Sequence, residues 1–247
     1  MHSQATLPLL LKQLHLASMY TQWEEISLQA AQEKWDYPQY LTALANYELA
    51  SRRQKRIQRH LKESSLPLGK TLDTFDFAAC KSINAAQITA LANNIEWVQK
   101  ANNLMIFGPS GVGKTHLAAA IGCRLIERGI RVLFTPTTAL VQKLQQARRD
   151  YKLTDSLNKL ARFNLLILDD IGYVKKDEAE TSVLFELIAQ RYENTGLIIT
   201  SNQPFKEWDQ IFPDNIMAIA AIDRLVHHAT IINITDDSYR RKKSTEK

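Results

Sequence analysis

The sequence has few of the features that mark secreted, disulfide-linked or membrane-spanning proteins. Cys80 and Cys123 are the only cysteines among 247 residues, and they lie far apart with no Cys-x-x-Cys spacing. Both are therefore expected to be reduced core residues, as is typical of the cytosol. The chain shows no secretory signal, and no apolar run approaches the ~20 residues that a membrane helix needs. We predict a cytoplasmic protein with no membrane partner.

Glycine is absent from residues 1–64, and this part of the chain shows helical patterns. The stretch "LPLLLKQLHLASM" repeats leucine at helical spacing, which predicts one apolar helix face. The stretch "DYPQ" has the features of a helix start, with Asp36 as cap, a proline in the first turn and Gln39 three residues on. Ser, Pro and Gly in "SSLPLGK" then break the pattern. We therefore predict a helical domain over residues 1–64 and a second domain over residues 65–247.

Short apolar runs alternate with helix-like stretches beyond this boundary. The runs are "NLMIFG", "VLFT", "LLILDD", "LIITSN" and "IINI". Such alternation is typical of the α/β class, in which a mainly parallel sheet is covered by helices on both faces. The second domain is therefore predicted to contain a five-stranded parallel sheet.

One stretch has the spacing of a phosphate-binding loop. The residues "GPSGVGKT" match G-x-x-x-x-G-K-[ST], with an apolar strand before them and a helix after them. The glycines let backbone N–H groups surround a phosphate, and Lys114 adds a positive charge toward the outer phosphates. The Thr115 hydroxyl is available to Mg²⁺. The residues predicted to contact the nucleotide are Gly108, Pro109, Ser110, Gly111, Val112, Gly113, Lys114, Thr115 and His116.

Two adjacent carboxylates end the apolar run "LLILDD". Like charges at neighbouring positions repel, so a positive partner is expected beside them. If this strand lies beside the phosphate loop, Asp169 would associate with Mg²⁺, because Mg²⁺ prefers oxygen ligands. Asp170 would then orient the attacking water. Asn202, which ends the next strand, would hold its amide against the γ-phosphate or the water, although asparagine at this position is also a common turn residue.

The order of these motifs resembles that of the AAA+ ATPases. Within them the chain is similar to the IstB-type transposition helper proteins of bacterial insertion sequences, which are related to DnaC-type helicase loaders. The stretches "TLDTFDF", "LLILDDIGY", "DRLVHHATIINI" and "DSYRRK" carry this likeness over nearly the whole chain. The resemblance implies a P-loop NTPase (AAA+) fold with ATP and Mg²⁺ as cofactors, after a small helical domain. Because few residues follow "IINI", the helical lid is expected to be reduced or absent.

The resemblance also implies catalytic roles for residues outside the phosphate loop. Asn202 becomes the sensor-one residue, and Arg224 becomes an arginine finger that reaches the γ-phosphate bound to a neighbouring subunit. The active ATPase is therefore expected to be a homo-oligomer. Many AAA+ proteins have Glu at the position of Asp170, and the shorter side chain reaches less far, so hydrolysis is expected to be slow or partner-stimulated.

Two further assignments rest on the resemblance alone. Phe75 or Phe77 is expected to border the adenine. Arg240 or Arg241 is the candidate to replace the second sensor arginine that a lid would otherwise supply.

The resemblance implies double-stranded DNA as a partner, and two basic clusters offer a physical route to it. The net charge is +5, with a pI of about 9.1. The first cluster contains Arg52, Arg53, Lys55, Arg56 and Arg59. All of them except Arg53 recur at three- or four-residue spacing and so share one helix face. The second contains Lys143, Arg148, Arg149 and Lys152. Both suit phosphate contacts without base readout. A solvated helix face or a subunit contact is the alternative for the first cluster, and Lys175 and Lys176 are either DNA-coupled or ordinary surface lysines.

The leading functional hypothesis is an ATP-driven, DNA-binding oligomer that assists a transposase in selecting its target. A replicative helicase loader of the DnaC type would use the same ATP site with a helicase and single-stranded DNA as partners. A nucleotide-gated scaffold that barely hydrolyses ATP is a third possibility, left open by Asp170. A small-molecule kinase would need a substrate pocket with lid arginines, and no such segment is evident.

Overall fold

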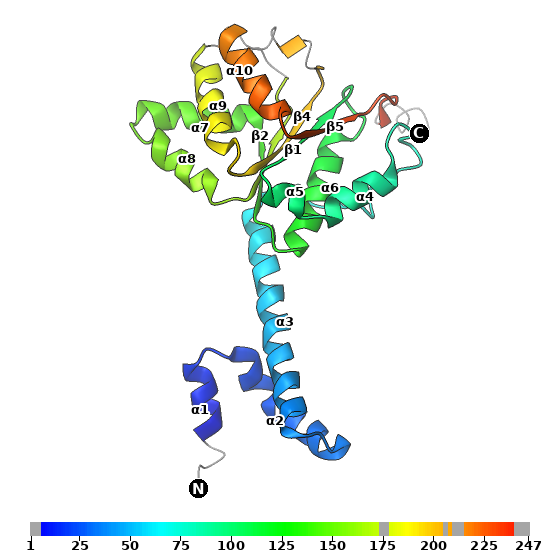
Figure 1. Ribbon diagram of the computed structural model, residues 1–247, viewed down its shortest axis with the longest axis vertical. Coiled ribbons are helices and arrows are strands. Elements are labelled where there is room, and N and C mark those ends of the chain that lie inside the picture. The colour runs from blue at the N-terminus through cyan, green and yellow to red at the C-terminus, as the bar shows by residue number, and fades with distance from the viewer. Residues whose placement is uncertain (1–5, 173–177, 205–206, 209–214, 240–247) are drawn as a thin grey trace. The chain divides into compact units, whose positions relative to one another are not determined.

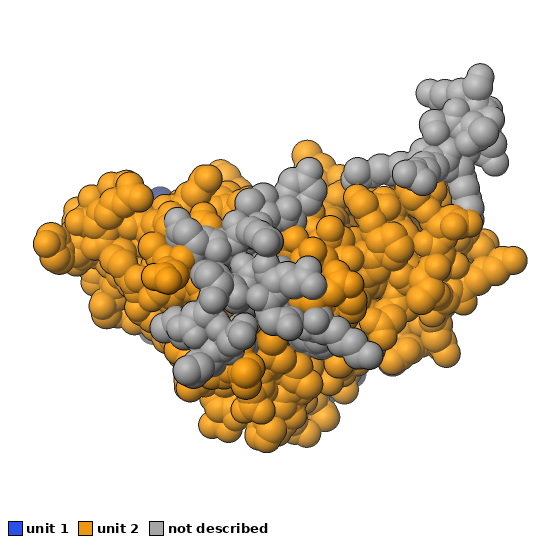
Figure 2. Space-filling model, turned by 90° about the horizontal axis from the view of Figure 1, so that it is seen from above, with its two compact units in different colours: residues 1–59 blue, residues 60–247 orange. Residues whose placement is uncertain are grey.

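The computed structural model describes residues 6–172, 178–204, 207–208 and 215–239. Contacts between Cα atoms divide the chain into two compact units, residues 1–59 (unit 1) and residues 60–247 (unit 2, orange in Figure 2). The division falls inside a helix that ends at Glu63. No helix in the described ranges is long and apolar enough to cross a membrane.

Unit 1 is built from helices, as the sequence predicts. These are α1 (Thr6–Gln13), α2 (Ala17–Glu33) and the greater part of α3 (Tyr37–Glu63). The predicted helix start is confirmed, because Gln39 N–H donates to Asp36 Oδ1 at 2.7 Å and Asp36 N–H donates to Gln39 Oε1 at 2.9 Å. These reciprocal bonds form a capping box. Of the leucines predicted to share one face of α1, only Leu11 is buried.

A buried carboxylate connects α2 to α3. Glu48 on α3 accepts hydrogen bonds from the backbone N–H groups of Ser18 and Met19, at 2.8 and 3.2 Å, in the first turn of α2. Arg52 donates to the other oxygen of Glu48 at 2.8 Å and to the carbonyl of His15 at 3.0 Å. Glu48 therefore satisfies helix-end N–H groups that would otherwise lack partners.

Unit 2 contains the predicted five-stranded parallel sheet. Its strands are β1 (Asn103–Phe107), β2 (Val132–Pro136), β3 (Leu165–Asp169), β4 (Gly196–Ser201) and β5 (Ala229–Asn233), in the order β2-β3-β4-β1-β5. All four pairings are parallel, with Leu104 opposite Ile198 in the centre. The strand β1 is buried throughout, which explains why its residues are continuously apolar rather than alternating.

Helices cover both faces of this sheet (Figure 1). One layer holds α4 (Ala85–Asn93), α5 (Glu96–Gln99) and α6 (Lys114–Glu127); the other holds α7 (Thr137–Arg149), α8 (Leu153–Ala161), α9 (Glu178–Arg191) and α10 (Asn215–Val226). Successive strand residues point to opposite layers. Leu166 and Leu168 join the core beneath α7 and α9, whereas the Ile167 side chain lies against Gly122 of α6.

The sheet order determines where the functional residues meet. The central strands β3, β4 and β1 are neighbours, and because they are parallel their carboxyl ends lie at one edge. Ligands of open α/β sheets bind at this edge. The chain passes very close to itself there: a Cβ added to Gly108 would lie 2.5 Å from the carbonyl oxygen of Ile234. Only glycine fits at this position.

Candidate nucleotide-binding site

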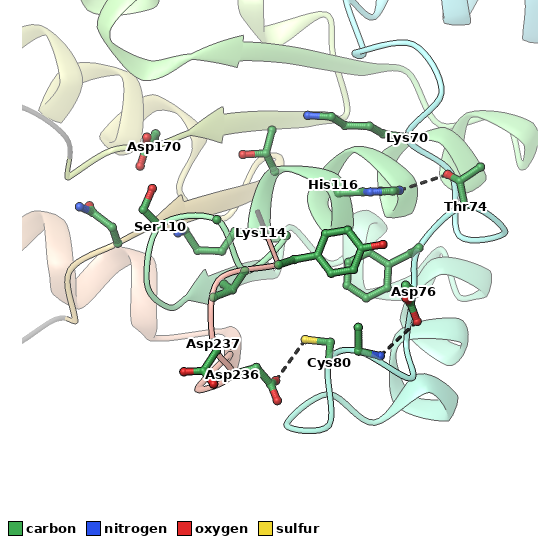
Figure 3. Close-up of a pocket in the computed structure, with 18 residues that line it drawn as sticks. Lys70, Thr74, Asp76, Cys80, Ser110, Lys114, His116, Asp170, Asp236 and Asp237 are labelled. Carbon is green, nitrogen blue, oxygen red and sulfur yellow. Dashed lines mark hydrogen bonds between the residues drawn. The ribbon is translucent and has the colours of Figure 1, made fainter. Parts of the chain in front are cut away.

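A cavity of about 350 Å³ opens at the carboxyl edge of the sheet. Its lining comes from residues 70–80, residues 110–116, the ends of β3 and β4, and the segment that follows β5. In Figure 3, Ser110, Lys114 and Asp170 lie on one side of the cavity, and Thr74, Asp76 and Cys80 lie on the other. The volume falls in the range of roughly 300–1,000 Å³ that is common for small-molecule sites.

The phosphate loop has the backbone conformation that its glycines allow. Gly111 and Gly113 have φ angles of 86° and 100°, in the left-handed region that favours glycine. Gly113 is the N-cap residue of α6, so the loop leads directly into the positive end of the helix dipole. Backbone N–H groups at such a helix start form an anion site.

Lys114 is the charged side chain of this loop. Its Nζ atom donates to the carbonyl oxygens of Gly108 and Pro109, both at 2.8 Å, and the residue is 7% exposed. The ammonium group therefore stays within the loop and borders the cavity in which a phosphate would lie.

The structure brings together the two residues predicted to hold Mg²⁺. Thr115 Oγ1 donates to Asp169 Oδ2 at 3.1 Å, across a sequence separation of 54 residues. A hydroxyl and a carboxylate are oxygen donors of the kind that Mg²⁺ binds, usually with one or two protein ligands and several waters. The residues present therefore fit this ion.

Asp170 and Asn202 both line the cavity. Asp170 has a left-handed backbone, with φ 60°, which turns the chain immediately after β3. Burial raises the pKa of its carboxyl group, Asp169 raises it further, and Lys114 opposes the shift. A carboxylate with a raised pKa is a better hydrogen-bond acceptor for a nucleophilic water.

Thr200 is a site residue that sequence reasoning missed. It is fully buried on β4, and its Oγ1 donates to Asp169 Oδ1 at 2.7 Å and accepts from the backbone N–H of Asp170 at 2.8 Å. One hydroxyl thus holds both members of the aspartate pair. The only signal in the sequence is a hydroxyl residue within the otherwise apolar run "LIIT", which strand propensity alone also explains.

An aromatic and hydroxyl-rich wall forms another side of the cavity. Phe75 lines it and packs against the phosphate loop, where a Cβ on Gly113 would come within 3.1 Å of the ring. Phe77 stacks edge-on against Phe75, with ring centroids 4.8 Å apart. His116 Nε2 lies 3.0 Å from the carbonyl oxygen of Thr71 and 3.2 Å from Thr74 Oγ1. Of the two aromatic candidates for the adenine, Phe75 therefore borders the cavity directly.

The segment after β5 forms the last part of the wall. Asp236 accepts from the backbone N–H groups of Lys81 and Ser82 at 3.0 Å each, from the Ser82 hydroxyl, and from the Cys80 thiol at 3.2 Å. These bonds, above all that from the Ser82 hydroxyl, lower the Asp236 pKa to about 2. The Tyr239 N–H donates to the carbonyl of Gly111 at 3.1 Å. The chain after β5 is therefore fastened both to the 80–82 turn and to the phosphate loop.

Arg224 lies apart from these residues. It belongs to the last turn of α10, and its guanidinium carbon lies 5.0 Å from the ring centroid of Phe185 on α9. Its Nη1 atom is buried and has no hydrogen-bond partner among the described residues. Arg224 is not among those that line the cavity. The structure therefore does not bring it together with Lys114 within one chain.

The predicted DNA-binding residues lie on α3 and around α7 and α8. Arg53, Arg56 and Arg59 are exposed on α3, and Lys143, Arg149 and Lys152 are exposed in unit 2. Arg52 pairs with Glu48, and Arg148 pairs with Glu186 and donates to Ser182 Oγ at 3.1 Å. The candidates Lys175, Lys176, Arg240 and Arg241 lie outside the described residues.

The parallel sheet, the phosphate loop and the cavity beside it define an α/β protein with a P-loop nucleotide-binding fold. Among solved structures, the DnaC helicase loader is similar with a TM-score of 0.55 and 22% identity, covering 68% of this chain and 97% of that one. AMPPCP-bound DnaA from Aquifex aeolicus gives a TM-score of 0.58 and 21% identity, covering 74% of this chain and 57% of that one. At these identities the likeness shows the fold.

The family described as IstB-like ATP binding protein matches residues 9–247, and the chain belongs to it. It is 53% identical to an insertion sequence ATP-binding protein of Sinorhizobium fredii (strain NBRC 101917 / NGR234), over 98% of this chain and 82% of that protein. It is 37% identical to the ATP-binding protein of insertion sequence IS21 from Pseudomonas aeruginosa, over 96% and 89% of the two chains. The family predicted from the motifs is confirmed.

Proposed function

We propose that this ATP-binding protein is a Mg²⁺-dependent ATPase that assembles on duplex DNA and assists a transposase in target selection. The observation that carries the enzymatic part is the arrangement of Thr115, Asp169 and Thr200. Their hydrogen bonds place the Asp169 carboxylate beside the phosphate loop, and Thr115 lines the cavity together with Lys114, Asp170 and Asn202.

The phosphate loop and β3 are proposed to contact different parts of the Mg²⁺–nucleotide complex. The backbone N–H groups at the start of α6 and the Lys114 ammonium receive the phosphates. Thr115 and Asp169 would hold Mg²⁺, which neutralises charge on the outer phosphates when it is bound. Phe75 offers an apolar face to the base from the wall on the other side of the loop.

Asp170 and Asn202 are the residues proposed to act on the attacking water. Both line the cavity beyond the phosphate loop. The Asp170 carboxylate accepts a hydrogen bond from the water, and the Asn202 amide contacts the water or the γ-phosphate. Because aspartate reaches less far than glutamate, we expect slow turnover that a partner stimulates.

Arg224 is proposed to act on the nucleotide of a neighbouring subunit. Support comes from the resemblance and from the position of this residue on α10, away from the cavity-lining residues of its own chain. A positive charge supplied from another subunit stabilises the transition state of phosphoryl transfer. ATP hydrolysis would then require an oligomer.

The DNA and transposase partners are inferred from surface charge and from the relatives of this chain. Exposed basic side chains on α3 and around α7 suit phosphate contacts, and the names of the relatives place those proteins in insertion sequences. The fold similarity to a helicase loader keeps the loader function as the alternative. Binding of the full chain to duplex and to single-stranded DNA of equal length, with ATP present, separates the two. Preference for duplex supports transposition, and preference for single strands contradicts it.

The trans arrangement is tested by mixing two inactive variants. Arg224→Ala subunits should bind ATP almost normally but hydrolyse it poorly, and Asp170→Asn subunits should behave in the same way. In verified mixed assemblies some interfaces hold one intact arginine and one intact pocket, so partial activity should return. No recovery, or full activity of Arg224→Ala alone, would remove Arg224 from the reaction.

A further inference from the structure

A cluster of metal-ligating side chains lies near the opposite edge of the sheet from the nucleotide cavity. Glu193 follows α9, and His227 and His228 connect α10 to β5, close to where β4 and β5 begin. All three residues are exposed, and one ligand atom from each lies within 4.8 Å of the other two. No other group of this kind occurs in the described part of the chain.

The backbone that carries these side chains is anchored on both sides. His227 N–H donates to the carbonyl of Asp223 at 3.0 Å, which continues the helical bonding of α10. The His228 carbonyl accepts from Asn103 N–H at 2.9 Å at the start of β1. After Glu193, the N–H of Asn194 donates to the carbonyl of Arg191 at 3.0 Å. The ligands are therefore positioned by secondary structure rather than by a long loop.

Tyr192 contacts two of the three side chains of the cluster. Its hydroxyl lies 3.0 Å from His227 Nδ1. It also forms a side-chain hydrogen bond with the Glu193 carboxylate. Both bonds are satisfied when Nδ1–H donates to the tyrosine oxygen and the tyrosine hydroxyl donates to the carboxylate. His227 Nε2 then keeps its lone pair for a metal ion, as in many metal sites where the second ring nitrogen donates to an oxygen.

We propose that Glu193, His227 and His228 form a binding site for a divalent transition metal ion. Zn²⁺ suits this ligand set, because it binds neutral imidazole nitrogen and carboxylate oxygen and accepts water at the remaining position. Mg²⁺ and Ca²⁺ prefer ligand sets made of oxygen alone, so they are not expected here. This site is separate from the Mg²⁺ site proposed at Thr115 and Asp169.

The bound ion would join the ends of two helices that already contact each other. Glu193 adjoins the end of α9, and the histidines follow the last turn of α10. The same two helices carry Phe185 and Arg224, whose side chains stack. The metal would therefore limit movement of α10, and with it of Arg224, relative to the rest of unit 2.

The test measures Zn²⁺ binding by the full chain, without a polyhistidine tag, in competition with a chromogenic chelator. Excess Mg²⁺ occupies oxygen-rich sites such as that of Asp169, so they do not contribute to the measured Zn²⁺ stoichiometry. One equivalent should bind. Zn²⁺ binding should weaken at least about tenfold in each of the ligand variants His227→Asn, His228→Asn and Glu193→Gln. Tyr192→Phe removes the hydroxyl that hydrogen-bonds His227 and should weaken binding roughly 10- to 100-fold. The matched control His15→Asn, an exposed histidine of unit 1, should leave it unchanged.

X-ray absorption of the zinc-loaded chain provides a second measurement. Two imidazoles and oxygen ligands are expected. Far-ultraviolet circular dichroism of each variant checks that these surface substitutions leave the fold intact. Absence of stoichiometric Zn²⁺ binding would overturn the proposal, as would unchanged affinity in the His227→Asn/His228→Asn variant or sulfur ligands in the absorption spectrum. None of these outcomes depends on ATP hydrolysis.

Discussion

The nucleotide cavity and the exposed basic face of α3 differ in how their polar side chains are held. Around the cavity, Thr115, Asp169 and Thr200 form a connected set of hydrogen bonds, partly or fully buried. On α3, Arg53, Arg56 and Arg59 are exposed to solvent. Buried polar groups need defined partners, whereas exposed charges do not. The side chains around the cavity are therefore held in one geometry, which indicates a particular chemistry. The arginines of the basic face indicate only that a negatively charged partner is favoured.

The aspartate pair provides the sharpest test of the cavity. Asp170→Asn should retain ATP and Mg²⁺ but lower the turnover rate by roughly 10²-fold or more, because its proposed task is to orient water. Asp169→Asn should instead weaken Mg²⁺-dependent ATP binding. Titration of nucleotide with and without Mg²⁺, together with steady-state hydrolysis, separates the two effects. If both variants lose binding and rate to the same extent, the division of roles is wrong.

Lys114→Ala should lower ATP affinity by roughly 10- to 100-fold, because a hydrogen bond to a charged group contributes about 1.5–3 kcal/mol. The assembly on DNA that depends on ATP should be lost with it. Direct titration with a non-hydrolysable ATP analogue measures the affinity. Lys159→Ala, which removes an exposed lysine of α8, is the matched control. Unchanged affinity in Lys114→Ala would show that the loop lysine does not contact the phosphates.

Thr200→Val keeps the shape of a buried residue but removes the hydroxyl that joins Asp169 to the backbone of Asp170. Turnover should fall about tenfold, and the free energy of unfolding should fall by about 1–3 kcal/mol because a buried N–H loses its partner. Thr200→Ser keeps the hydroxyl and should restore most of the rate. A Val variant with normal Mg²⁺ dependence and normal rate would limit Thr200 to a packing role.

The basic face of α3 can be tested without assuming any geometry. Replacing Arg53, Arg56 and Arg59 together with Gln should reduce the slope of log DNA affinity against log salt by roughly 2–3 units, at about 0.9 per lost phosphate contact. Arg52→Gln is the comparison variant, because Arg52 pairs with Glu48. Its replacement should lower the stability of unit 1 and change the slope little. An unaltered slope in the triple variant would assign this face to another contact.

Asp236→Asn should have the smallest effect, a loss of a few-fold in nucleotide affinity through a looser wall. The folded-state pKa of about 2 lies below the ordinary value of 3.8, so the carboxylate stabilises the fold above about pH 3.8, and this contribution is lost as the pH falls toward 2. The stability difference between wild type and Asp236→Asn, measured by urea unfolding, should therefore shrink with acidity. A difference that is constant from pH 7 to pH 2.5 would contradict the role of the charge.

Local patterns in the sequence determined much of this protein. The phosphate loop, the capping box at Asp36 and Gln39, and the apolar runs of the strands each depend on residues that are close in the chain, so their spacing alone restricts the backbone. The position of Asp169 at a strand end was also predictable locally, from the apolar run that ends in two carboxylates, whereas its meeting with Thr115 joins residues 54 positions apart. The alternation of runs also determined the parallel sheet.

Only the tertiary structure decided which distant side chains meet. Thr200 reaches Asp169 across 31 residues because β4 lies beside β3, and Asp236 reaches Ser82 across 154 residues because β5 ends at the same edge as the loop. Arg52, which sequence spacing groups with the DNA-binding residues, also bonds to the buried carboxylate of Glu48, a partner that spacing alone does not reveal. Residue spacing determines which face of a helix or strand a side chain lies on. Which side chains of different elements contact each other depends on how those elements pack.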